Sequence, residues 1–229
     1  MLNHSMEKAP GNKQPRSPED LNTPIELHYS VATEISRVQF TARKYSWLVE
    51  NGYQPQLPTS IKNHLESGDM VSDEEIRTVI EAEYQDHVYS EKARELTEAW
   101  KSESGGFIKK LETLGRPLPQ TFKIFLSKYG TGGSYGYPDV VQLNLNRISD
   151  RGILYIVFHE MVHLTIQDLI EKYDISHWTK ERLVDLTMNK FFPNKRQLQQ
   201  DPEHTGRVSD IFEKGFPNIE RIIKEISKI

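Results

Sequence analysis

The chain has 229 residues, of which 36% are hydrophobic and 27% are charged, and its formal net charge at pH 7 is -4. These values are ordinary for a globular protein with one sizeable domain or two small ones. The charges are spread along the chain, so no basic block predicts binding to nucleic acid. The absence of cysteine excludes disulfides, thiolate catalysis and zinc–thiolate sites, so any metal site has to use His, Asp or Glu.

The N-terminus lacks the apolar segment of a signal peptide. The most apolar run, at 153–158, is too short to span a bilayer. We therefore expect a cytoplasmic protein without a membrane partner. Residues 1–22 are rich in Pro, Asn, Ser, Lys and Glu and are predicted to form a flexible tail.

Residues 23–116 are predicted to form a mainly helical N-terminal region, because apolar residues recur there at helical spacing. Ser72 and Glu75 have the spacing of a capping box and mark one helix start. Ser104-Gly105-Gly106 is expected to interrupt the helix that follows. The expected helices cover residues 30–50, 72–100 (with or without a break) and a short segment that ends at 114.

Residues 117–229 change character and predict an α+β arrangement. Alternation of apolar and polar residues predicts strands at 121–129 and 140–146, and the glycine-rich segment at 130–138 is expected to be a flexible loop. Three helical patterns follow, and Pro193 ends the second of them. These helices are expected at 152–172, 179–192 and 217–228.

The helix expected at 152–172 is apolar on nearly all sides, which is typical of a buried helix. It nevertheless contains His159, Glu160 and His163 in the pattern H-E-x-x-H. Buried polar groups without partners are costly, so these three side chains need partners. Residues four apart share a helix face, and two imidazoles at this spacing can bind one zinc ion while the glutamate acts on a water.

Catalytic zinc usually has three protein ligands and one open position, so a third ligand has to follow His163. The metzincin pattern is excluded, because Ile166 and Leu169 stand where that class has its glycine and its third histidine. A deformylase-type site is excluded by the lack of cysteine.

Glu181 and Asp185 form the pattern E-x-x-x-D on the next expected helix, and Glu181 follows His163 by 18 residues. This combination resembles the gluzincin metallopeptidases, the thermolysin-like clan, over about residues 118–192. The resemblance implies Zn²⁺ as cofactor, with His159, His163 and Glu181 as metal ligands and Asp185 as the acid that orients His159. It also implies a small mixed or antiparallel sheet packed on the H-E-x-x-H helix and on the helix of Glu181.

Other side chains could supply the third ligand. Glu171 lies two turns beyond His163 on the same helix, too far along its axis, whereas a loop residue, His177, is the main competitor. The resemblance also implies an oxyanion-stabilising Tyr or His, which no motif identifies. The competing ligands are Glu171, Asp174 and His177, and the oxyanion candidates are Tyr135, Tyr137, Tyr173, His177 and His204.

In gluzincins an antiparallel edge strand pairs with the substrate backbone. The strand expected at 140–146 is our candidate, and Val140, Gln142 and Asn144 would then bind substrate by β-augmentation. The predicted partner is a peptide or protein substrate, and no nucleic acid or membrane is expected.

These patterns predict a zinc metallopeptidase in which Glu160 acts as general base on a zinc-activated water. One alternative is a metal-binding regulator or pseudo-peptidase that works through partner binding. Another is a latent peptidase whose segment 20–115 covers the cleft. The third alternative is a helical interaction protein that binds no metal.

Overall fold

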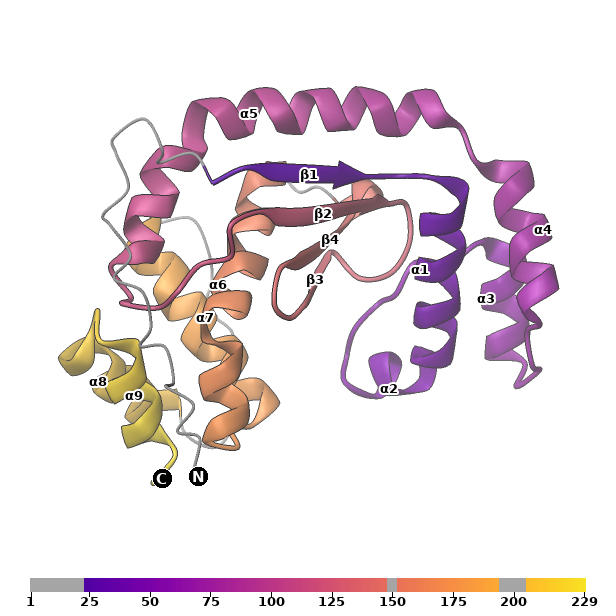
Figure 1. Cartoon of the computed structure of the whole chain (residues 1–229). Helices are drawn as coiled ribbons and strands as arrows, with labels where there is room; N and C mark the ends of the chain where they lie inside the picture. The colour runs from indigo at the N-terminus through magenta and orange to yellow at the C-terminus, as the bar shows by residue number, and fades with distance from the viewer. Residues whose placement is uncertain (1–22, 148–151, 194–204) are drawn as a thin grey trace, which may run out of the picture.

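The computed structural model describes residues 23–147, 152–193 and 205–229. The tail predicted at 1–22 and the candidate His204 lie outside the described residues. Within them, helices surround a four-stranded mixed sheet of order β1-β2-β4-β3, which confirms the predicted α+β class (Figure 1). The strands are β1 (Ile25–His28), β2 (Phe122–Ser127), β3 (Gly133–Gly136) and β4 (Val140–Asn144).

The sheet is parallel except at one edge. β2 pairs in parallel with β1 on one side and with β4 on the other, and β3 pairs antiparallel with β4 as an edge strand. The two longer strands were predicted, whereas β1 and β3 were not. β1 has only four residues, and β3 lies inside the glycine-rich segment that we expected to be a loop, so neither has enough alternation to predict a strand.

The helices of the described residues fall into an N-terminal and a C-terminal group, joined by the sheet (Figure 1). A short 3-10 helix (Leu145–Arg147) follows β4. The N-terminal helices are α1 (Val31–Arg43), α2 (Tyr45–Glu50), α3 (Thr59–Glu66), α4 (Asp73–Glu83) and α5 (Asp86–Glu112). The C-terminal helices are α6 (Ile153–Lys172), α7 (His177–Phe191), α8 (Thr205–Gly215) and α9 (Ile219–Ile226).

The expected break at Ser104-Gly105-Gly106 is wrong, because α5 runs through it without interruption. A glycine inside a helix costs about 1 kcal/mol relative to alanine. Packing on both sides of the glycines offsets this cost, since Trp100, Phe107 and Leu111 are buried in the main core. The short helices α3 and α8 were not predicted, whereas α6, α7 and α9 lie within two residues of their predicted ranges.

α6 is the centre of the main hydrophobic core. Residues of α5, β2, β4, α7 and α9 belong to the same buried cluster. By length and composition α6 could cross a membrane, but 83% of its most apolar window is buried inside the fold. A second, smaller cluster joins α1, α3 and α4. α5 therefore packs with the C-terminal group, so the main core crosses the expected division near residue 117.

Glu34 joins α1 to the sheet and to α5. It is 1% exposed, and its carboxylate accepts hydrogen bonds from the Tyr89 hydroxyl of α5, from the Ser127 hydroxyl of β2, and from the Lys128 backbone N–H at 2.8 Å. A buried carboxylate needs such donors, because losing its hydration is otherwise uncompensated. The three bonds fix the position of α1 on the sheet.

We expect Tyr89→Phe to lower the free energy of unfolding by about 1–3 kcal/mol, because it leaves the buried Glu34 carboxylate with one donor fewer. The control is Tyr84→Phe, which removes a hydroxyl bonded at 3.4 Å to the exposed Asp86 and should change stability by less than about 0.5 kcal/mol. Chemical denaturation of both variants measures the difference. Equal stability of the two variants would contradict the role of Glu34.

Candidate metal centre

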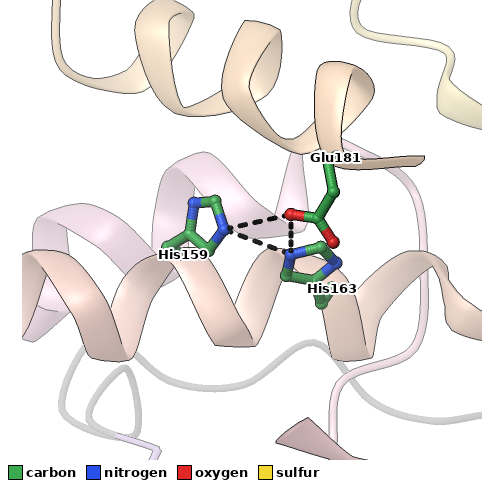
Figure 2. Close-up of side chains that lie close together, drawn as sticks. All are labelled: His159, His163 and Glu181. Atoms are coloured by element: carbon green, nitrogen blue, oxygen red, sulfur yellow. Dashed lines mark hydrogen bonds and ion pairs between the residues drawn. The ribbon is translucent and has the colours of Figure 1, made fainter. Parts of the chain in front are cut away.

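Two helices bring three potential metal ligands together. His159 and His163 lie one turn apart on α6, and Glu181 faces them from α7 (Figure 2). Their exposed fractions are only 8%, 2% and 8%. The described residues contain one cluster of this kind, and it consists of these three side chains.

The distances within the cluster suit a single ion. The Nε2 atoms of His159 and His163 are 3.1 Å apart, and Glu181 Oε2 lies 3.4 Å from Nε2 of His163 and 3.9 Å from Nε2 of His159. Ligand atoms held about 2.0–2.1 Å from a tetrahedral zinc ion are about 3.3–3.4 Å from one another. The triangle is close to that size, so these residues fit a zinc ion.

The protonation states also suit a metal. Burial lowers the pKa of His163 to about 4, so its imidazole is neutral at pH 7, which is the form that binds metal. Although burial alone raises the pKa of Glu181, hydrogen bonds from His159 and His163 and the charge of Lys180 hold it well below its usual range. The cluster therefore offers a neutral imidazole at His163 and an ionised carboxylate at Glu181.

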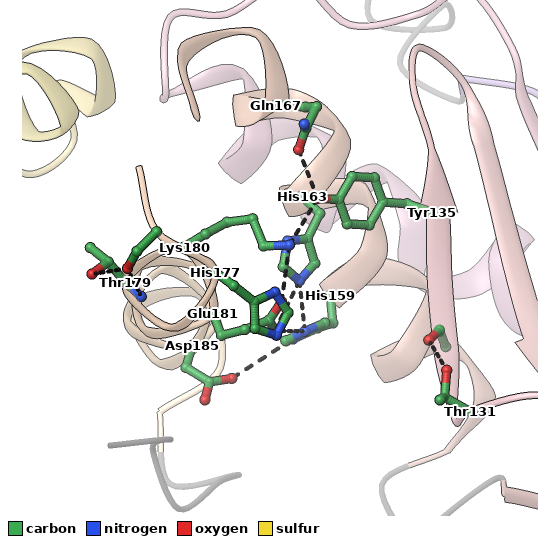
Figure 3. Close-up of polar contacts among 12 residues, drawn as sticks. Thr131, Tyr135, His159, His163, Gln167, His177, Thr179, Lys180, Glu181 and Asp185 are labelled. Carbon is green, nitrogen blue, oxygen red and sulfur yellow. Dashed lines mark hydrogen bonds and ion pairs between the residues drawn. The ribbon is translucent and has the colours of Figure 1, made fainter. Parts of the chain in front are cut away.

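Asp185 lies one turn after Glu181 on α7 and points toward the His159 ring (Figure 3). Its side chain is fully buried, and its Oδ1 is 3.8 Å from Nδ1 of His159. One nitrogen of His159 thus faces the ligand cluster and the other faces a carboxylate. This is the arrangement in which an acid fixes the tautomer and direction of a ligating imidazole.

The second oxygen of Glu181 lies near Lys180 and His177 of the same helix. It is 3.2 Å from Lys180 Nζ and 4.0 Å from His177 Nδ1. His177, predicted in a loop, is the first residue of α7, and its Nε2 is 2.7 Å from the Tyr53 hydroxyl. His177 therefore lies beside the three converging donors and is not one of them.

Glu160 lies between the ligand cluster and the edge strand. It is 6% exposed, and burial raises its pKa to about 7 against the opposing charge of His159. A general base works best when its pKa is near the working pH. β3 passes so close that a Cβ on Gly133 would lie 2.4 Å from Glu160 Oε1. Glycine at 133 is thus what lets the sheet edge reach the acid.

The expected substrate strand is wrong in its position. Val140, Gln142 and Asn144 lie in β4, which pairs with β2 on one side and with β3 on the other. The Asn144 side chain is buried and donates to Gln56 Oε1 and to the Gly130 carbonyl, so it is not available to a substrate. The strand with an unpaired outer edge beside Glu160 is β3, within the described residues.

A pocket of about 510 Å³ lies over the cluster, within the usual size range of ligand sites. Two of the oxyanion candidates, Tyr135 and His177, line it, whereas Tyr137 and Tyr173 do not. The Tyr135 ring stacks on His163 at 4.7 Å, and its hydroxyl contacts Gln167 at 2.7 Å and Lys180 at 3.1 Å.

One wall of this pocket comes from the N-terminal region, and the sequence did not indicate it. Arg37 and Phe40 of α1, Trp47 of α2 and Tyr53 after it all line the pocket. Trp47 and Phe40 are 45% and 52% exposed, so they present apolar surface beside the cluster. No motif links these residues to H-E-x-x-H, because their only relation to it is proximity in the fold. Deleting this region would remove part of the site itself.

Comparison of the chain with models of known protein families, with curated proteins and with solved structures gave no match in any of the three. The interpretation of the site therefore rests on its residues and their geometry.

We expect Gly133→Ala to displace Glu160 or β3, because the new methyl group would overlap the carboxyl group. Overpacking of this kind costs about 1–3 kcal/mol in free energy of unfolding. Gly132→Ala is the matched control, since a Cβ at 132 meets nothing within 4 Å. Thermal unfolding of both variants measures the effect, and equal melting temperatures would contradict the close approach of β3 to α6.

Proposed function

We propose that this chain is a zinc-dependent peptidase of the gluzincin type. The observation that carries the proposal is the convergence of His159, His163 and Glu181 at distances suited to one ion, with Glu160 beside them in a pocket. The resemblance of H-E-x-x-H followed by E-x-x-x-D to gluzincins supports the same conclusion.

Each residue then has a separate task. His159, His163 and Glu181 would hold the ion, and Asp185 would keep His159 in its ligating orientation. Bound zinc would supply Lewis-acid chemistry at the scissile carbonyl and make water more acidic. Glu160, with its pKa near 7, would accept a proton from the attacking water and pass it to the leaving amine.

The edge strand β3 supports a peptide as substrate. Its outer edge has no strand partner among the described residues, and it lies directly against Glu160. An extended peptide could add to this edge by backbone hydrogen bonds, which would bring its carbonyl groups past the acid. Substrate pairing is thus assigned to Gly133–Gly136 in place of the strand first expected.

A metal-binding regulator without catalysis is the second candidate. Metal binding alone would need only the three ligands, and Glu160 would have no role in a protein that only binds metal. A carboxyl group buried beside them at the wall of an accessible pocket favours the enzyme.

We expect the untagged parent protein to contain near-stoichiometric zinc and Glu181→Ala to contain much less. Losing a residue that only orients a ligand costs about 10–100-fold in metal affinity, so losing a ligand should cost more. Added zinc should raise the melting temperature of the parent and have little effect on the variant. Elemental mass spectrometry and calorimetry provide the two measurements.

The control for this experiment is Glu171→Ala, which removes an exposed carboxylate of α6 and should retain the zinc. Equal zinc in the parent and in Glu181→Ala would remove Glu181 from the ligand set. A parent that takes up no zinc, even when it is supplied, would contradict the proposed function.

Glu160→Gln should retain zinc and lose turnover by about 10²–10⁴-fold, the usual contribution of a general base. Cleavage of a mixed peptide library, followed by mass spectrometry of the products, measures the rate, and Glu171→Gln is the matched surface control. If Glu160→Gln cuts as fast as the parent, the assignment of Glu160 is wrong.

A further inference from the structure

Arg37 is a buried cation that has only neutral partners. It is 6% exposed, its Nε donates to the Tyr129 carbonyl at 3.4 Å, and its Nη1 donates to the side-chain oxygen of Gln142. No ion pair joins it to a carboxylate among the described residues. Burial lowers the pKa of Arg37 only to about 10, so its charge persists at pH 7. Buried charges are normally paired, which makes this one unusual.

The nearest carboxylate along α1 forms no ion pair or hydrogen bond with Arg37. Glu34 lies one turn earlier and is occupied by the donors of Tyr89, Ser127 and Lys128. The carboxylates of Glu160 and Glu34 both act on Arg37 through space, without a hydrogen bond to it. The guanidinium therefore has no hydrogen-bonded anion among the described residues.

The backbone is shaped to hold this guanidinium in place. Gly130 has a φ of +89°, and a Cβ at that position would lie 2.3 Å from Nη2 of Arg37. Nη2 has no hydrogen-bond acceptor among the described residues, yet it is not one of their fully enclosed unpaired atoms. Nε and Nη1 anchor the group through their hydrogen bonds to Tyr129 and Gln142.

Arg37 lines the same pocket as Glu160 and the cluster of His159, His163 and Glu181. The pocket also holds Arg147, which donates to the Gln54 carbonyl, and Lys180, which is paired with Glu181. Its lining thus carries three permanent cations and two carboxylates, before any positive charge from a bound metal is added. An anionic ligand group would complement this charge.

We infer that Arg37 binds a carboxylate of the substrate, so that the enzyme prefers peptides with a carboxylate near the scissile bond. This inference rests on the proposed peptidase function. A fixed guanidinium binds carboxylates by charge-assisted hydrogen bonds, often in pairs. The carboxylate belongs to the peptide C-terminus or to an acidic side chain, and these two sources share the same chemistry.

Binding without cleavage tests the inference. Glu160→Gln protein is dialysed to equilibrium against three pools of synthetic hexapeptides, and bound peptide is measured by mass spectrometry. One pool has a free C-terminus and neutral side chains, the second is amidated with one glutamate, and the third is amidated and neutral. We expect at least one carboxylate pool to bind about 10–100-fold more tightly than the neutral pool.

Adding Arg37→Met to the Glu160→Gln protein should abolish the preference for peptides with a carboxylate, whereas adding Arg77→Met should preserve it. Arg77 is an exposed arginine of α4, a helix that packs on α1. Arg77→Met removes one positive charge, as Arg37→Met does. Arg37→Lys keeps the charge without the planar fork and should retain part of the preference. Its binding and the melting temperatures of all variants distinguish lost recognition from lost folding.

Equal binding of all three pools to the zinc-loaded protein would overturn the inference and leave the zinc site intact. The pool that binds more tightly identifies the source of the carboxylate. The same comparison is made on zinc-free protein. If the chain takes up no zinc but still prefers carboxylates through Arg37, the peptidase proposal fails and the anion site stands.

Discussion

The structure depends on satisfying polar side chains inside its most buried helix. α6 is enclosed by the sheet and by α5, α7 and α9, yet it carries two imidazoles and a carboxyl group in its middle. Groups of this kind are stable in a core only with partners of matching charge. α7 supplies partners for the two imidazoles through Glu181 and Asp185, so the packing of α7 on α6 is what assembles the cluster.

The edge of the sheet is set by the same helix. β3 approaches α6 at Gly133, where any side chain would overlap Glu160 or Ile156. The strand is therefore held against the acid and exposes its other edge. The local sequence of β3 favours a turn, and its strand conformation comes from pairing with β4 and from contact with α6.

α1 serves both stability and the site through residues three apart. Glu34 points to the sheet and α5, where its donors are buried, and Arg37 lies at the pocket with neutral partners. The first residue binds the N-terminal region to the main core, and the second thereby gains a fixed position beside the cluster of His159, His163 and Glu181. The stability of α1 on the sheet is thus a condition for the proposed substrate contact.

Periodicity and spacing were sufficient to predict α6, α7, β2 and β4, because long apolar patterns record which face is buried. The spacing also led to His159, Glu160 and His163, since residues one helical turn apart leave a pattern in the sequence, whereas Glu181 came from the resemblance to the gluzincin pattern. The continuity of α5 across its glycines could not be predicted, because tertiary packing outweighs local propensity there.

The sequence by itself determined the residue types of the cluster, two imidazoles and one carboxylate on neighbouring helices, and with them the metal chemistry that they allow. Only the tertiary structure decided that β3 is the edge strand, that His177 lies outside the cluster, and that Arg37 and Tyr53 line the pocket. The physical reason is that the residues on one face of a helix recur at a fixed spacing in the sequence. Contacts between segments a hundred residues apart depend on how whole elements pack, and no local pattern carries that information.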